Sequence, residues 1–132
     1  MLENQHAMAF ASFQTFGRKL SGGPEAMVRG FFRELRKWFS KPGFAGSGFH
    51  RLAMELADLP GHPARRIASK HKNLLEGHLV EVLAKAGLVN AEKHGRQIWV
   101  LSEGVIALAV IHADKNYCSA AEDAALALIR RG

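Results

Sequence analysis

The hydrophobic positions of this chain recur every three to four residues, which is the period of an α-helix and not of a β-strand. The clearest amphipathic segment runs from Pro24 to Phe39, between a Ser-Gly-Gly break and a Lys-Pro-Gly turn. Its proline stands at a first helical position, where proline is favoured. The same period predicts a first helix over residues 1–20 and a short third helix over residues 46–58.

The second half of the chain predicts two long helices separated by a short turn. The fourth helix begins near Pro63 and ends before Gly87, a residue that commonly follows a helix C-terminus. Asn90 is suited to cap a fifth helix that extends to about His112.

A last helix follows and is rich in alanine. It is expected to start at Asp114 or at Ser119, because Ser119 and Glu122 have the spacing of a capping box. No segment requires a β-strand, and no linker or repeat divides the chain. We therefore predict an all-α fold of about six helices in a single domain that spans residues 1–132.

The segment Ile98–Ile111 is apolar around nearly its whole circumference, with only Ser102 and Glu103 clearly polar. It is too short to span a bilayer, which requires roughly 20 apolar residues in a helix. A surface helix of a small domain normally buries one stripe and exposes a polar face. The segment is thus expected to be covered on two sides, by the core of the domain and by a second copy of the chain or another partner.

Composition places the chain among folded proteins, with 48% hydrophobic and 23% charged residues. The single cysteine, Cys118, excludes an intramolecular disulfide, and the N-terminus lacks the pattern of a signal peptide, so a cytoplasmic location is expected. The net charge of +6 comes from dispersed basic residues without interleaved aromatics. This distribution favours a solvated basic surface over a nucleic-acid-binding patch.

The residues that could carry catalysis or bind metal form no recognisable motif. His71 and His78 are two helical turns apart, whereas metal-binding histidines on a helix usually stand at i and i+4. No nucleophile elbow, phosphate-binding glycine loop or cysteine-based zinc pattern is present. We therefore predict no enzyme activity, no metal and no cofactor.

Two features leave alternatives open. Glu103 interrupts the most apolar segment, where it either pairs with another polar group or faces a ligand cavity, or else reaches solvent. The aromatic residues of the first three helices form the core in the simpler interpretation, but gaps between such helices can also bind small apolar molecules.

The order of the motifs resembles the C-terminal regulatory domain of TetR-family transcriptional repressors. The resemblance rests on Trp38–Phe44, Met54–Ala57, Pro60–Ala64, Lys70–Lys72 and Leu101–Ile106, followed by the alanine-rich helix. Each motif is weakly specific, and their order and spacing carry the likeness. It is strongest from about residue 38 to residue 129.

The resemblance implies a homodimeric domain that senses a small, largely apolar effector. Residues 1–20 would form a connecting helix, residues 24–87 the pocket-forming helices, and residues 90–131 the helices that pair in a four-helix bundle. The implied ligand-binding residues are Phe10, Phe13, Phe31, Phe49, Leu52, His71, His78, Trp99 and Glu103. The implied dimer interface comprises Gly104, Ile106, Val110, Ala121, Ala124, Ala125 and Leu128.

The resemblance also implies that DNA is bound only through a helix-turn-helix unit that this chain lacks, with no role for a membrane. The chain would be a fragment of a repressor or a reduced relative of one. Two other hypotheses remain: a stand-alone helical carrier or enzyme that uses the same cavity, and a direct nucleic-acid binder driven by the positive charge.

Overall fold

The computed structural model describes residues 22–39, 63–112, 114 and 116–131. Within these residues there are four α-helices and no strand: α2 (Pro24–Phe39), α4 (Pro63–Lys85), α5 (Ala91–His112) and α6 (Asn116–Arg131). The all-α prediction is confirmed, although this part of the chain holds four helices and not about six. The helices predicted over residues 1–20 and 46–58 lie outside the described residues.

The turn between α4 and α5 follows the pattern predicted from Gly87. Gly87 has a φ of 96°, in the left-handed region that glycine adopts without strain. Its N–H donates to the carbonyl of Ala84 at 3.0 Å, and the N–H of Leu88 donates to the carbonyl of Leu83 at 3.1 Å. These two hydrogen bonds form a Schellman motif, which satisfies the last carbonyls of α4 and reverses the chain.

The start of α5 agrees with the sequence, and α6 starts near the first of its two predicted positions. The carbonyl of Asn90 accepts from the N–H of His94 at 3.1 Å, as expected for the residue that precedes α5. At the next helix the carboxylate of Asp114 accepts from the N–H of Asn116 at 2.9 Å. The alternative start at Ser119 is wrong, because this residue already lies inside α6.

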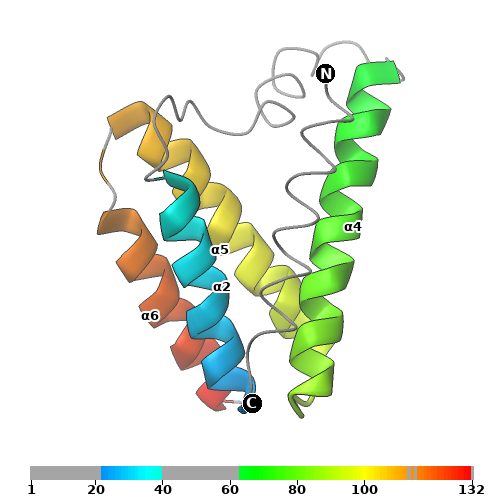
Figure 1. Cartoon of the computed structure of the whole chain (residues 1–132), viewed down its shortest axis with the longest axis vertical. Helices are drawn as coiled ribbons and strands as arrows, with labels where there is room; N and C mark the ends of the chain where they lie inside the picture. The colour runs from blue at the N-terminus through cyan, green and yellow to red at the C-terminus, as the bar shows by residue number, and fades with distance from the viewer. Residues whose placement is uncertain (1–21, 40–62, 113, 115, 132) are drawn as a thin grey trace.

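The helices form two antiparallel pairs that share α5. Figure 1 shows α5 running from its junction with α4, at the bottom of the view, to its junction with α6 at the upper left. α5 packs against both α4 and α6, and α2 packs mainly against α6. Among the helices described, none combines the length and the apolar character needed to cross a bilayer.

The core lies where α2, α5 and α6 meet the inner face of α4. Phe31 and Phe32 on α2 are fully buried, with ring centroids 5.3 Å apart in an edge-to-face arrangement. Leu79 of α4 and Ile98 of α5 are completely covered in the same cluster. The helical period of α2 thus directs its large apolar side chains inward, and burial of each contributes on the order of 1.5–3 kcal/mol.

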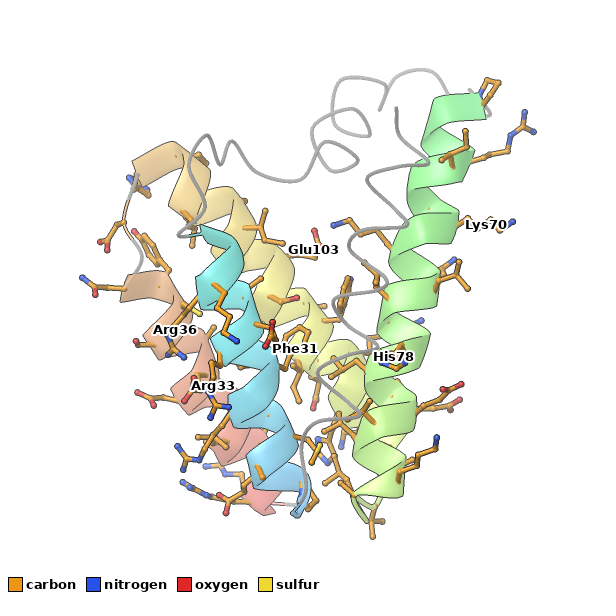
Figure 2. The ribbon with its side chains drawn as sticks, in the orientation of Figure 1. Phe31, Arg33, Arg36, Lys70, His78 and Glu103 are labelled. Atoms are coloured by element: carbon orange, nitrogen blue, oxygen red, sulfur yellow. The ribbon has the colours of Figure 1, made fainter. Side chains whose placement is uncertain are left out.

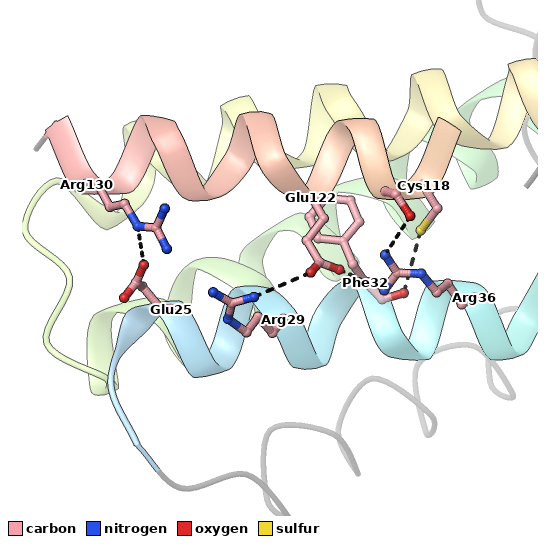
Figure 3. Close-up of polar contacts among 8 residues, drawn as sticks. Glu25, Arg29, Phe32, Arg36, Cys118, Glu122 and Arg130 are labelled. Atoms are coloured by element: carbon pink, nitrogen blue, oxygen red, sulfur yellow. Dashed lines mark hydrogen bonds and ion pairs between the residues drawn. The ribbon is translucent and has the colours of Figure 1, made fainter. Parts of the chain in front are cut away.

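Ion pairs connect the exposed edges of α2 and α6 (Figure 3). Arg36 contacts Glu122 at 2.7 Å and donates to the hydroxyl of Ser119 at 3.3 Å. Arg29 lies 3.9 Å from the other oxygen of Glu122. Arg130 and Glu25 form a further ion pair. These contacts, called the α2–α6 ion pairs below, match residues near opposite ends of α2 and α6, as expected for antiparallel helices.

Cys118 lies beneath these ion pairs and is completely buried. Its thiol donates weakly to the carbonyl of Phe32, with 3.7 Å between Sγ and the oxygen. Burial raises the pKa of the Cys118 thiol, an effect that Arg36 opposes and Glu122 reinforces. The group therefore behaves as a small, protonated core side chain at neutral pH.

α4 and α5 approach most closely near their shared turn. A Cβ placed on Gly95 would lie 2.6 Å from Cγ2 of Val80 and 3.5 Å from the Cα of the same residue. The first distance is too short for the present side-chain positions, and Val80 cannot easily give way because it is β-branched and stiff at χ1, whereas the second is an ordinary van der Waals contact. Glycine at position 95 therefore permits this crossing of α4 and α5.

Candidate functional site

Two of the residues predicted to bind ligand, Phe31 and Trp99, meet between α2 and α5, and a third, Glu103, lies near Trp99 on α5. The ring centroids of Phe31 and Trp99 are 6.1 Å apart, with an interplanar angle of 50°. Both side chains are buried. Glu103 follows Trp99 by four residues and therefore lies on the same side of α5. It projects from α5 toward α4 in Figure 2.

Glu103 pairs with Lys72 of α4. The Lys72 ammonium lies 2.6 Å from a carboxylate oxygen of Glu103, and the two side chains are 21% and 22% exposed. Of the alternatives left open for Glu103, pairing across the helices is the one observed. A charge pair that is largely removed from water balances a substantial desolvation cost against its mutual attraction.

The Lys72 ammonium also lies over the ring of Trp99, 5.9 Å from the centroid. This distance is within the range of a cation–π interaction, and Trp is the most favourable aromatic partner. Lys72, Trp99 and Glu103 are called the α4–α5 cation cluster below. A cation at this position contacts a carboxylate and an indole face at once.

The remaining predicted ligand residues are only partly described. His78 is half-buried on α4. His71 belongs to α4, but its side chain lies outside the described part of the structure. Phe10, Phe13, Phe49 and Leu52 lie outside the described residues altogether. Among the residues that are described, no three of the types His, Cys, Asp and Glu gather closely enough to hold a metal ion.

His94 is a buried polar residue that the sequence analysis missed. It is 3% exposed at the start of α5, and its Nδ1 lies 3.1 Å from Oε1 of Gln97. An N–H at Nδ1 would donate to this amide oxygen, which leaves Nε2 as the acceptor. Within the described residues, Nε2 is buried without a hydrogen-bond partner.

Part of the outward face of α5 and α6 is apolar. On α5, Val100 is 65% and Ile111 is 70% exposed. Gly104 lies between them, and a Cβ added to it would meet nothing within 4 Å. On α6 three exposed alanines, Ala120, Ala124 and Ala127, lie beside the exposed Asp123. We call these two rows of residues the uncovered stripes.

The opposite side of the Ile98–Ile111 segment faces the core of the same chain. Ile98, Val105 and Ala109 are buried there. Ser102, one of its two polar residues, is also buried, and its hydroxyl donates to the carbonyl of Trp99 at 2.7 Å. This bond within the helix explains how a polar side chain lies in an apolar cluster.

Comparison with known proteins decides the fold. No family model matches the sequence. No curated protein matches it at a significant level. The structure does match a TetR-family transcriptional regulator from Streptomyces coelicolor, with a TM-score of 0.84 and 22% sequence identity. The match covers 98% of this chain and 68% of that chain. The fold is TetR-like.

Within this TetR-like fold, the positions predicted for a dimer interface fall into two groups. Ile106, Ala121 and Ala125 are buried in the core of the single chain. Gly104 and Ala124 are exposed, and Leu128 is half-buried. The Val110 side chain lies outside the described part of the structure. The uncovered stripes therefore lie on the two helices expected to pair, largely at positions other than those named from the sequence.

Proposed function

We propose that this chain is the effector-sensing and dimerisation part of a TetR-like transcriptional regulator. The TetR-like fold, which extends along 98% of the chain, is the observation that carries the proposal. The role is that of a cytoplasmic regulator and not of an enzyme. Residues 1–132 act as one domain.

Dimerisation through α5 and α6 is supported by the uncovered stripes. Val100 and Ile111 leave large apolar surfaces in water, and burying such surface gains about 25 cal/mol per Å². Gly104 and the three exposed alanines present little side-chain volume, which permits close approach of helices from a second copy. The proposed interface is therefore made of the uncovered stripes together with Leu128.

Effector binding is proposed for the region around Phe31, Trp99 and Glu103, with His78 at its edge. The buried aromatic pair provides apolar surface, and the adjoining ion pair provides polar groups that can orient a ligand. An effector that prefers one arrangement of the helices would shift the population of the two arrangements of the dimer.

The dimer is tested most sharply with Gly104→Leu. This variant should fold as a monomer, because leucine meets nothing in the single chain but blocks close approach of a second copy. Light scattering coupled to size-exclusion chromatography would give one chain mass for the variant and two for the wild type. Leucine also has a higher helix propensity than glycine, so the variant should keep its helical circular-dichroism signal.

Gly77→Leu is the matched control. Gly77 is an exposed glycine within α4, and a Cβ added to it also meets nothing within 4 Å. This variant should remain a dimer. A monomeric wild type, or a Gly104→Leu protein that dimerises as strongly as the wild type, would overturn the proposed interface.

A further inference from the structure

The α4–α5 cation cluster already holds one cation, the ammonium of Lys72. This ammonium lies 2.6 Å from the Glu103 carboxylate and 5.9 Å from the centre of the Trp99 ring. A carboxylate and an indole face both attract positive charge. Two of the three groups in the cluster therefore select a cation, and the third is a cation supplied by the protein.

The ion pair is not the only charged contact that links α4 to α5. Arg96 of α5 lies 3.1 Å from Glu76 of α4, with the Arg96 side chain 75% exposed. The Arg96 end of that pair is in water, although the Glu76 side chain is 21% exposed, and ion pairs with an exposed partner commonly contribute little to stability. The Lys72–Glu103 pair is more enclosed, and this enclosure is what a ligand-recognition site requires.

We propose that Lys72 occupies the place of a positively charged group of the effector, and that the effector is an apolar amine or quaternary ammonium compound. This inference rests on the proposed effector-sensing function. On binding, the effector's cation takes the position between Glu103 and Trp99, and the Lys72 ammonium withdraws to solvent. Lysine is suited to this exchange, because its long flexible stem lets the charge reach water while the stem stays on the protein.

The charge balance favours a cationic ligand over an anionic one. When a cation replaces Lys72, the carboxylate of Glu103 keeps a partner and no charge is left enclosed and unpaired. An anion that bound Lys72 would instead approach Glu103, and two like charges at this distance repel each other. An uncharged ligand would leave the existing pair intact and gain nothing from it.

Three probes with alkyl tails of similar length and different head groups test the inference: octyltrimethylammonium, octanoate and octanol. Isothermal titration calorimetry of the wild-type protein should give an affinity for octyltrimethylammonium roughly tenfold higher than for the other two probes. Lys72→Met should strengthen ammonium binding, because no internal cation competes. Glu103→Gln should weaken it about tenfold and leave octanol binding unchanged.

Two matched variants serve as controls. Lys70→Met removes an exposed lysine that projects away from α5 in Figure 2, and Glu76→Gln removes the carboxylate of the other α4–α5 pair. Both should leave the affinity for octyltrimethylammonium at the wild-type value. The comparison of the three probes needs only the wild-type protein, so it holds even if a variant folds poorly.

The outcomes separate this inference from the function on which it rests. Octanoate or octanol binding as tightly as octyltrimethylammonium would overturn the amine effector and support a sensor of another ligand class. Ammonium binding that Glu103→Gln leaves unchanged would overturn the role of the cluster. Failure of all three probes to bind would overturn the inference and count against small-molecule sensing itself.

Discussion

The α2–α6 and α4–α5 contacts use opposite arrangements of apolar and charged groups. Between α2 and α6, buried groups such as Cys118 fill the centre and the arginines of the ion pairs lie at the edge, with Arg130 and Glu25 about half exposed and only Glu122 more enclosed. Between α4 and α5, Gly95 packs directly against Val80 with no room for a side chain, and a charge pair lies mostly enclosed beside Trp99. The first arrangement is suited to holding two helices in one register. The second places an ion pair and an aromatic ring between two helices.

The largest effect is expected from breaking the apolar centre at α2. Phe32→Ala should lower the free energy of unfolding by about 3–5 kcal/mol, because a fully buried ring is replaced by a cavity. Urea denaturation followed by circular dichroism would measure it. Phe32→Leu, which keeps most of the apolar volume, should lose much less. Equal losses for the two variants would contradict the view that buried volume at Phe32 holds α2 in place.

A smaller loss is expected where α4 and α5 cross. Gly95→Ala should lower the free energy of unfolding by about 1–3 kcal/mol, since the added Cβ meets Val80 and the cost outweighs the helix propensity gained. The same denaturation experiment applies. The double variant with Val80→Ala should recover part of the loss, because it removes the methyl groups that collide.

Gly104→Ala provides the reference for that measurement, because its added Cβ meets nothing in the single chain. In a monomeric background it should raise the free energy of unfolding by up to about 1 kcal/mol, the ordinary gain from glycine to alanine in a helix. A Gly95→Ala protein that is stabilised to the same degree would show that the α4–α5 crossing is not closely packed.

The smallest effect is expected at the exposed end of the α2–α6 ion pairs. Glu25→Gln should change the free energy of unfolding by less than about 0.5 kcal/mol, because water and salt screen its contact with Arg130. When the denaturation is repeated at low and high salt, high salt should abolish even this difference. A loss comparable to that of Phe32→Ala would mean that the surface charges, and not the buried apolar centre, hold α2 against α6.

The sequence was most informative where a pattern is local. Pro24 and the regular apolar positions after it predicted α2 correctly, and Gly87 marked the end of α4. These features depend on neighbouring residues, whose geometry is set by the helix period and by the φ that glycine allows. The TetR-like arrangement followed from the order of several such features.

The contacts between distant segments could not be predicted in this way. Lys72 looked like an ordinary surface lysine until α5 placed Glu103 and Trp99 beside it. Gly95 carried no signal as an isolated helical glycine, because its role depends on the residue that faces it. Ile106 was expected at a dimer interface and has the apolar side chain that such a position requires. In the structure it is buried in the core of its own chain.

The close contact between Gly95 and Val80 has a mechanical consequence. If α4 moves as a rigid rod, this contact is its pivot, and displacement grows with distance from it. Lys72 lies eight residues from Val80 and Pro63 lies seventeen, or about 12 Å and 26 Å along the helix axis. A rotation that separates Lys72 from Glu103 by a given amount would therefore move the far end of α4 about twice as far. Gly95, which allows α4 and α5 to pack closely, would thus place the pivot of α4 near the turn, with Lys72 closer to that pivot than Pro63.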